Sequence, residues 1–292
     1  MTSSGPLRNQ TLPRRPRRAL TNGLMWACAT VCTGAALVPL IWLLWYVISQ
    51  GAPALSFAFF TQVPRPVGEP GGGMANAIVG TLILLGLASA VGLPIGLLGG
   101  IYLAEFGGSR IGAAIRFCAD VLSGVPSIVI GVFVYALVVV PMHRFSALAG
   151  GLALGVMMIP TVMRTSEELI RLVPNSLREA ALALGASRPL TVFRVVLLAA
   201  RAGLVTGILL AIARVAGETA PLLFTAFGSG LWSTRLDEPI ASLPVQVFTY
   251  AISPYRDWQA QAWAGALVLV TIVLVLSAAA RYATRGRLRQ VM

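Results

Sequence analysis

The sequence is poor in the residues that most catalytic and metal sites use. Its 292 residues include no lysine, one histidine (His143), three cysteines and ten acidic residues. No GxxxxGK[ST] segment occurs, so the chain does not hold nucleotide phosphates in the usual way. The single histidine and the lack of a CxxC pair argue against a metal site and against a base-assisted nucleophile. We therefore expect no catalytic residue, no metal and no cofactor bound by this chain itself.

Charged residues are scarce as a class. Only 11% of the residues are charged, 57% are hydrophobic, and the mean hydropathy is +0.82. Because a soluble chain is about 25% charged, this composition predicts an all-α integral membrane protein. The net charge of +12 invites a comparison with nucleic-acid-binding proteins. The positions of the arginines explain it better, and we expect lipid rather than nucleic acid around this chain.

Six apolar segments approach or exceed the about 20 residues that a transmembrane helix needs. The first exceeds the 7–15 residues of a signal-peptide core, so we interpret it as an uncleaved span; a secretory or twin-arginine signal is the alternative. Residues 1–23, polar and rich in proline and arginine, are expected to be disordered, and residues 24–292 to form one transmembrane domain. The predicted spans are about 24–48, 76–103, 117–140, 147–163, 195–224 and 261–282.

The arginines predict the orientation of these spans. If the N-terminus is inside, sixteen of the 22 arginines fall in inside segments and two lie within the fifth span. Only four, Arg65, Arg144, Arg235 and Arg256, fall in outside segments. The positive-inside rule then places both termini in the cytoplasm.

The fifth predicted span carries two charges near its middle, Arg214 and Glu218. Each ionised group there costs roughly 2.5–3.5 kcal/mol on insertion scales, so their retention indicates a use or a pairing. Four residues apart on a helix, they share one face. Arginine stays protonated and binds oxyanions bidentately, which makes Arg214 a candidate for an anion path. Glu218 is a candidate for the same path, where it would either neutralise Arg214 while the path is empty or accept a hydrogen bond from a protonated oxyanion. A structural ion pair between Arg214 and Glu218 is the alternative.

Two further features are candidates for a part in transport. Arg164 follows the short fourth span and is either a second anion contact or an ordinary positive-inside anchor. Gly124 and Pro126 interrupt the third span and are either a hinge or a static kink. Asp120, next to this interruption, is expected to pair with Arg116 four residues before it.

The polar segment 165–190 is too regular for a disordered loop. Thr165 or Ser166 is placed to cap one short helix that Pro174 ends, and Asn175 or Ser176 to cap a second over 177–184. Gly185 stands where a left-handed C-terminal residue is expected. The second helix presents a small apolar patch, which suits either a lipid surface or a cleft on a cytoplasmic partner; it consists of Ala180, Ala181 and Leu184.

These residues resemble a known family. Glu179, Ala180, Ala181 and, after three further residues, Gly185 are similar to the EAA loop of the permeases of ATP-binding-cassette (ABC) importers, although the Leu-Pro that ends that pattern is Leu197-Leu198 here. Further segments resemble phosphate-importer permeases of this class: IYLAEFG (101–107), VPNSLREAA (173–181), LLAIARVAGETAPLLFTA (209–226) and SPY (253–255).

The resemblance implies the type I, MetI-like permease fold, with six transmembrane helices in a bacterial inner membrane. It further implies a heterodimer with a homologous permease, two copies of an ATPase that use ATP and Mg²⁺, and an extracytoplasmic phosphate-binding protein. The substrate would be inorganic phosphate, and the EAA loop would dock onto the ATPase. A permease for another oxyanion, such as sulfate or molybdate, is one alternative. A structural membrane subunit or a membrane-embedded enzyme is the alternative of another class.

Overall fold

The structure, a computed structural model, describes residues 16–67, 69 and 71–288. Within these ranges the regular secondary structure is entirely helical. The chain divides into two units, residues 1–49 and 50–292, and each is described by itself. The helices are α1 (Pro16–Gly51), η1 (Ala52–Ala54), α2 (Phe57–Thr61), α3 (Ala75–Phe106), α4 (Arg110–Gly124), α5 (Ser127–Val134), η2 (Tyr135–Val139), α6 (Val140–Met142), α7 (Ala147–Arg171), α8 (Asn175–Ala183), α9 (Arg188–Thr191), η3 (Val192–Val196), α10 (Leu197–Val215), α11 (Ala220–Thr225), α12 (Leu243–Ala251) and α13 (Arg256–Leu288).

Five helical stretches in the described ranges are long and apolar enough to cross a membrane, and α4 with α5 and α6 makes a sixth if the bent pair counts as one span. That pair is bent by 103° at the break between its two arms. The all-α membrane fold expected from the composition is therefore confirmed. The five are Thr21–Ala54, Ala75–Phe106, Ala147–Arg171, Arg188–Val215 and Arg256–Ala279.

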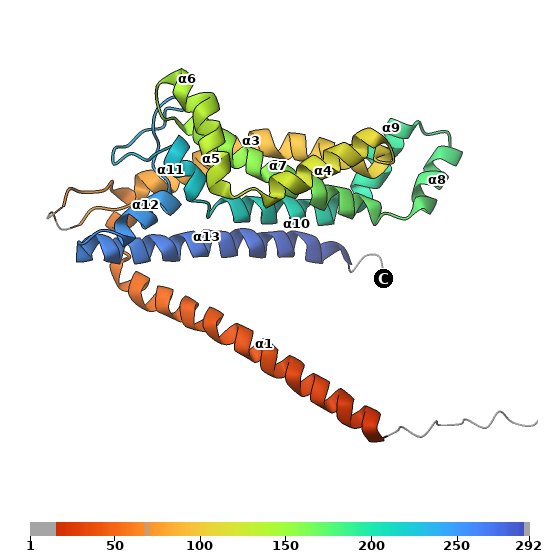
Figure 1. Ribbon diagram of the computed structural model, residues 1–292, viewed down its shortest axis with the longest axis horizontal. Coiled ribbons are helices and arrows are strands. Elements are labelled where there is room, and N and C mark those ends of the chain that lie inside the picture. The colour runs from red at the N-terminus through yellow and green to blue at the C-terminus, as the bar shows by residue number, and fades with distance from the viewer. Residues whose placement is uncertain (1–15, 68, 70, 289–292) are drawn as a thin grey trace, which may run out of the picture. The chain divides into compact units, whose positions relative to one another are not determined.

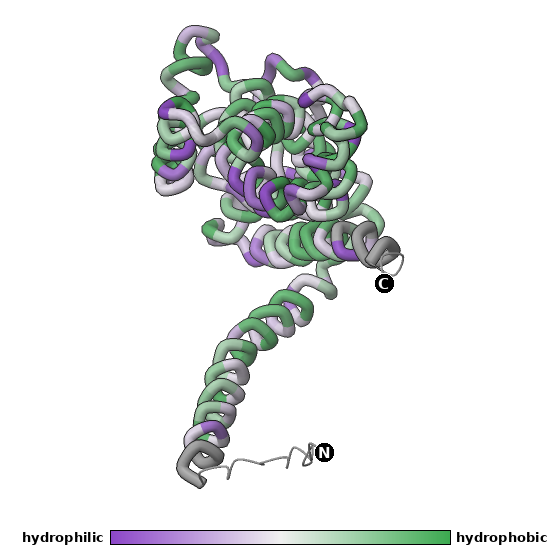
Figure 2. The backbone as a smooth tube through the Cα atoms, turned by 90° about the vertical axis from the view of Figure 1, so that its right-hand side faces the viewer, coloured by the Kyte–Doolittle hydropathy of each residue, from purple (hydrophilic) through white to green (hydrophobic). Residues whose placement is uncertain are grey.

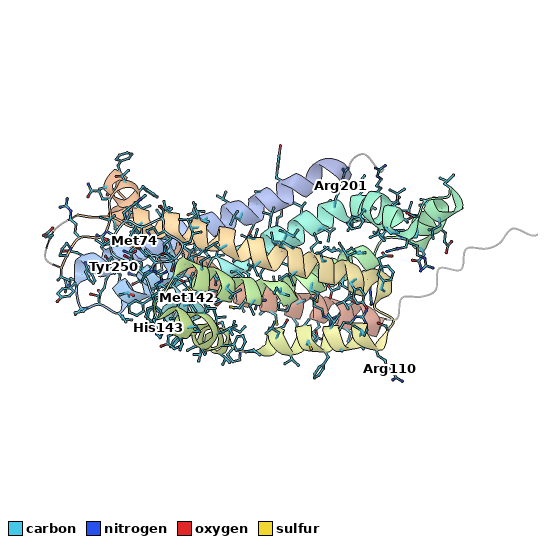
Figure 3. All side chains as sticks on the ribbon, turned by 90° about the horizontal axis from the view of Figure 1, so that it is seen from above. Met74, Arg110, Met142, His143, Arg201 and Tyr250 are labelled. Carbon is cyan, nitrogen blue, oxygen red and sulfur yellow. The ribbon has the colours of Figure 1, made fainter. Side chains whose placement is uncertain are left out.

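The second unit is a bundle of long helices that run side by side (Figure 1). Helix α7 packs against α3, α4 and α10, and α13 packs against α10 and α12. Helices α8 and α9 lie at one end of this bundle, and α11 and α12 lie at the other. Arg110 lies at the α8 end, whereas Met74 and Tyr250 lie at the α12 end (Figure 3). Seen from the α8 end, hydrophilic stretches gather at the near ends of hydrophobic helices (Figure 2).

Glycines let α3 and α7 approach each other closely. A methyl group on Gly92, Gly96 or Gly100 would lie 2.8 Å from Met158 Cβ, 2.8 Å from Val162 Cβ or 2.6 Å from Ser166 Cβ, respectively. Real β-carbons do not approach so closely, so these positions exclude any larger side chain without a shift of one helix. The spacing of four residues places the three glycines on one face of α3. The two helices are thus held as one tightly packed pair.

The start of the first helix and the segment between the last two spans differ from the sequence prediction. Helix α1 begins at Pro16, so residues 16–23 are helical rather than disordered, while residues 1–15 lie outside the described residues. Proline at the first helical position sacrifices no hydrogen bond. The segment between the predicted fifth and sixth spans contains α12, whose Leu243 and Tyr250 pack in a buried cluster with Phe59 and Met74.

Helix α7 continues to Arg171 instead of ending near residue 163. Ser166, predicted as a helix cap, is buried inside the helix, and so is Glu167. Polar residues are tolerated there because arginines pair with the Glu167 carboxylate. The first of the two expected short helices is therefore the last part of α7.

The fifth span ends at Val215 rather than at residue 224, and α11 begins after a break at residues 216–219. Pro221 explains the break, because its ring clashes with the carbonyl four residues earlier and it lacks the N–H for a helical bond. Glu218 therefore stands in a non-helical segment and not one turn beyond Arg214.

Candidate functional site

Arg214 closes the last turn of α10 and reaches α7. Its Nη1 donates a hydrogen bond of 3.4 Å to Thr161 Oγ1. The residue is exposed, and no carboxylate pairs with it among the described residues. An exposed guanidinium without a carboxylate partner retains its capacity to bind an oxyanion. This is the property that the sequence-based hypothesis for Arg214 requires.

Arg164 lies one turn of α7 beyond Thr161. Three residues rise about 4.5 Å along a helix, so the two candidate arginines meet neighbouring turns of the same helix. Arg164, however, is paired: its Nη2 lies 2.8 Å from Asp120 Oδ1 and its Nη1 lies 3.3 Å from Glu167 Oε2. An anion would have to compete with two carboxylates for Arg164, and Arg214 is the more available cation.

Glu167 is the centre of an ion-pair cluster that the sequence pattern did not reveal. Its side chain is 3% exposed, and it contacts Arg116 at 2.6 Å, Arg171 at 2.8 Å and Arg164 at 3.3 Å. Arg116 also donates hydrogen bonds to the Gly107 and Leu103 carbonyls. The cluster therefore joins α4 and α7 to the end of α3. The expected pairing of Asp120 with Arg116 is wrong, since Asp120 pairs with Arg164 and Arg116 pairs with Glu167.

Glu218 does not form the helical ion pair with Arg214 that was the alternative interpretation of these two charges. It lies in the break between α10 and α11, half-buried, and no ion pair joins it to Arg214 in the described part of the chain. A role as the permanent counter-ion of Arg214 therefore receives no support from the geometry. Its position beside the end of α10 leaves a role in substrate recognition as the remaining hypothesis.

The interruption of the third span is a sharp bend. Gly124 ends α4, Val125 is extended with ψ of 130°, and Pro126 precedes α5. A residue before proline favours this extended conformation, so the sequence itself produces the bend. Whether the bend moves during transport stays a prediction.

The EAA-like residues lie on α8 and on the turn that follows it. Glu179 and Ala180 are exposed and Ala181 is half-buried. Gly185 has φ of +83°, and its N–H and that of Ala186 donate to the carbonyls of Leu182 and Ala181. This is the left-handed helix end expected from the sequence. No residue of α8 is buried in the described structure, so the helix presents its surface outward.

Arg178, next to Glu179, was not singled out by the sequence pattern. Its guanidinium lies 2.8 Å from Glu105 on α3 and donates to the Ile170 and Val173 carbonyls at 3.0 and 2.6 Å. The two ionic partners are separated by 73 positions, and no local spacing predicts such a contact. Hydropathy does not distinguish Arg178 from any other arginine on an exposed helix, so only the fold reveals its contacts.

Taken together, the described residues offer a cation between α7 and α10 and an exposed helix at the α8 end. The first can bind an oxyanion within the bundle, and the second can dock on another protein. The bundle between them contains the tightly packed α3 and α7. This arrangement suits a transport protein that responds to a partner at its α8 end.

Comparisons with known proteins agree with this interpretation. Residues 96–289 match the family described as binding-protein-dependent transport system inner membrane component. A phosphate transport system permease protein PstA of Yersinia pestis is 47% identical over 259 residues, which cover 88% of this chain and 87% of that protein. A probable PstA of Methanocaldococcus jannaschii is 36% identical over 285 residues, and the match covers 99% of that protein.

Solved structures show the same fold. A chain of the MetNI methionine ABC transporter in an inward-facing conformation aligns with a TM-score of 0.57 and 20% identity, over 73% of this chain and 96% of that one. An amino acid ABC transporter chain aligns with a TM-score of 0.53 and 20% identity, over 72% of this chain and 92% of that one. These likenesses confirm the expected MetI-like permease fold. The chain belongs to the family of binding-protein-dependent transport system inner membrane components and, within it, to the PstA permeases.

Proposed function

We propose that this chain is the permease subunit of an ATP-driven phosphate importer and that it forms half of the translocation path. The observation that carries the proposal is Arg214, an exposed guanidinium between two membrane-spanning helices with a threonine hydroxyl as its hydrogen-bond partner. The PstA proteins to which the chain is similar are named as phosphate transport permeases, and a phosphate oxyanion is the ligand that a guanidinium binds best.

Arg214 is the first phosphate contact in this proposal. Arg164 lies about one helix turn further along α7 and receives the anion only after exchange of its bonds with Asp120 and Glu167. Glu218, in the break after α10, accepts a hydrogen bond from a protonated phosphate oxygen. Such a bond favours phosphate over sulfate, which has no proton to donate at neutral pH.

Coupling to ATP hydrolysis is assigned to α8 and the turn after it. The helix buries none of its residues, and Leu184 at its end is 89% exposed. A leucine exposed to that degree beside Ala180 and Ala181 forms an apolar patch suited to a cleft on a partner. The ATPase subunits, present in two copies, bind ATP and Mg²⁺, and α8 inserts into their surface.

The remaining partners follow from the two ends of the bundle. In a bacterial inner membrane with α8 on the cytoplasmic side, the α12 end faces an extracytoplasmic phosphate-binding protein. The connection before α12 offers it a charged surface, where a hydrogen bond from Arg235 holds the pKa of the Asp237 carboxyl below its ordinary value. A homologous permease completes the path as a heterodimer.

A purified complex tests this proposal. The chain is co-expressed with the candidate second permease, ATPase and binding protein and reconstituted into liposomes. Phosphate-loaded binding protein is expected to stimulate ATP hydrolysis and phosphate uptake, and sulfate- or molybdate-loaded protein is not. Uptake of one of those oxyanions in place of phosphate would reassign the substrate.

The docking role of α8 has its own test. Glu179→Arg reverses one exposed charge on α8, and we expect the ATPase to be lost from the purified complex while the two permeases remain together. Retention of the ATPase with full stimulated activity would remove α8 from the coupling surface.

A further inference from the structure

Helix α8 has little apolar packing to hold it in place. None of its residues is buried, and Leu177, Leu182 and Leu184 are all exposed. Its backbone lies mainly beside α9 and η3, which follow it in the chain. Apolar contacts therefore give α8 no firm attachment to the two helices, α3 and α7, that form the core of the bundle.

One side chain supplies that attachment. Arg178 projects from α8 and makes two contacts with Glu105 Oε1, from Nη2 at 2.8 Å and from Nε at 3.1 Å. It also donates to the Val173 carbonyl from Nη1 at 2.6 Å and to the Ile170 carbonyl from Nη2 at 3.0 Å. A single guanidinium thus bridges α8, the last turn of α7 and the end of α3.

The partners of Arg178 give this bridge strength. The last carbonyls of a helix lack intrahelical donors; Ile170 lies in the last turn of α7, and Val173 lies two residues after the helix ends. The side chains of Arg178 and Glu105 are 17% and 14% exposed, so water screens their attraction only in part. The fork of donors in arginine reaches a carboxylate and two carbonyls at once, which a lysine ammonium does not do with comparable geometry.

We infer that Arg178 is a positioning residue that transmits movement of α8 to α3 and α7. The inference rests on the proposed docking of α8 on an ATPase and adds the route by which that docking acts. Because glycines hold α3 tightly against α7, a force applied through Arg178 moves the two helices as one. Helix α7 carries Thr161 and Arg164, so the movement reaches the residues around Arg214.

A second route from α8 runs along the chain through α9 and η3 into α10. That route contains a π-helix, Val192–Val196, whose wider turn interrupts regular helical hydrogen bonding. The Arg178 bridge reaches α7 directly and without such an irregular segment. Movement of α8 therefore acts on both sides of the contact between Arg214 and Thr161, through α10 and through α7.

The experiment compares variants in the reconstituted complex with its ATPase and phosphate-loaded binding protein. Arg178→Leu and Glu105→Gln are each expected to retain the ATPase but to lower phosphate transported per ATP hydrolysed by about tenfold, the loss equivalent to about one charged hydrogen bond. Arg178→Lys is expected to recover part of the ratio. Because the two residues act together, the double variant is expected to be no worse than Arg178→Leu.

The matched control is Arg110→Leu, which removes the same charge from an exposed position at the same end of the bundle; its coupling ratio is expected to remain that of the unmodified chain. An unchanged ratio in Arg178→Leu would overturn the inference. So would loss of the ATPase or failure to assemble in both Arg178→Leu and Glu105→Gln, because Arg178 would then only maintain the fold or the docking surface. Failure of the docking proposal is distinguishable, since Glu179→Arg would then retain the ATPase.

Discussion

Arg214 owes its chemical availability to what surrounds it. Arg116, Arg164, Arg171 and Arg178 all have carboxylate partners, whereas Arg214 has a threonine hydroxyl. A carboxylate partner neutralises an arginine and competes with any anion, while a hydroxyl orients the guanidinium without neutralising it. Those four arginines hold helices together through carboxylates, whereas Arg214 keeps its charge available for an anion.

Replacing Arg214 tests this division. Arg214→Lys retains the charge but loses the planar fork, so we expect phosphate uptake to fall by about tenfold, a loss of about 1.4 kcal/mol. Phosphate uptake by the Arg214→Gln variant is expected to be lower still. Uptake of labelled phosphate by reconstituted liposomes measures both. Arg201→Lys, the same substitution at an exposed position on α10 (Figure 3), is the matched control and is expected to retain uptake. Equal uptake by Arg214→Lys and Arg201→Lys would contradict the assignment.

Glu218 is tested by selectivity. Glu218→Gln replaces the carboxylate with a neutral amide of the same size, which is a weaker acceptor for a phosphate proton and adds an N–H group that can donate to unprotonated sulfate. We expect phosphate uptake to fall by about tenfold while sulfate becomes a better competitor than it is for the unmodified chain. Assembly of the complex, followed by size-exclusion chromatography, should not change. Unchanged uptake and unchanged competition by sulfate would remove Glu218 from the substrate path.

At the scale of single residues, the sequence reveals which side chains are energetically costly in a membrane more readily than it reveals what those side chains contact. Arg214 was predictable because a charge within an apolar run is expensive. The partners were not predictable: Arg178 and Glu105 lie 73 positions apart, and Glu167 collects arginines from two helices. The prediction that Arg214 and Glu218 share one helix face is wrong, because α10 ends at Val215 and a helix cannot continue regularly toward Pro221.

At the scale of elements, the α3–α7 pair decides whether the bundle behaves as one body. Both helices carry glycines at spacings of four, and each contact brings a backbone or a β-carbon of one helix against the other. The predicted second span, 76–103, contains the glycines at 92, 96 and 100, and small residues at this spacing favour such an approach. The sequence prediction ended α7 too early, because the last part of the helix is polar. A side chain of α4 pairs with that part and allows it to be buried, and hydropathy does not show such a contact.

A pair of alanine substitutions tests the importance of this contact. A methyl group at Gly100 would lie 2.6 Å from Ser166 Cβ, whereas one at Gly86 on the same helix meets no atom within 4 Å. We therefore expect Gly100→Ala to destabilise the complex by about 1–3 kcal/mol and to lower its midpoint of thermal unfolding in detergent. Gly86→Ala is the matched control and should leave the midpoint unchanged or slightly higher. A midpoint that is the same in both variants would show that α3 and α7 are not tightly packed.

At the scale of the whole molecule, the arginines divide between the two ends. Arg110, Arg116, Arg171, Arg178 and Arg188 lie on the helical segments at the α8 end, and Arg65, Arg144, Arg235 and Arg256 lie in connections or at the helix start of the α12 end. The same division was predicted from the sequence, because the assignment of arginines to inside and outside segments depends only on the order of the spans. The positive-inside rule predicts that the α8 end is cytoplasmic.

Cysteine accessibility tests this orientation. Cys28, Cys32 and Cys118 are exposed and are first replaced by alanine. Single cysteines then replace Leu184, which is 89% exposed beyond α8, and Trp232, which is 55% exposed in the connection before α12. A membrane-impermeant maleimide applied outside intact spheroplasts is expected to label position 232 and to label position 184 only after the membrane is permeabilised. Labelling in the opposite order would invert the topology, and it would place α8 out of reach of any cytoplasmic ATPase.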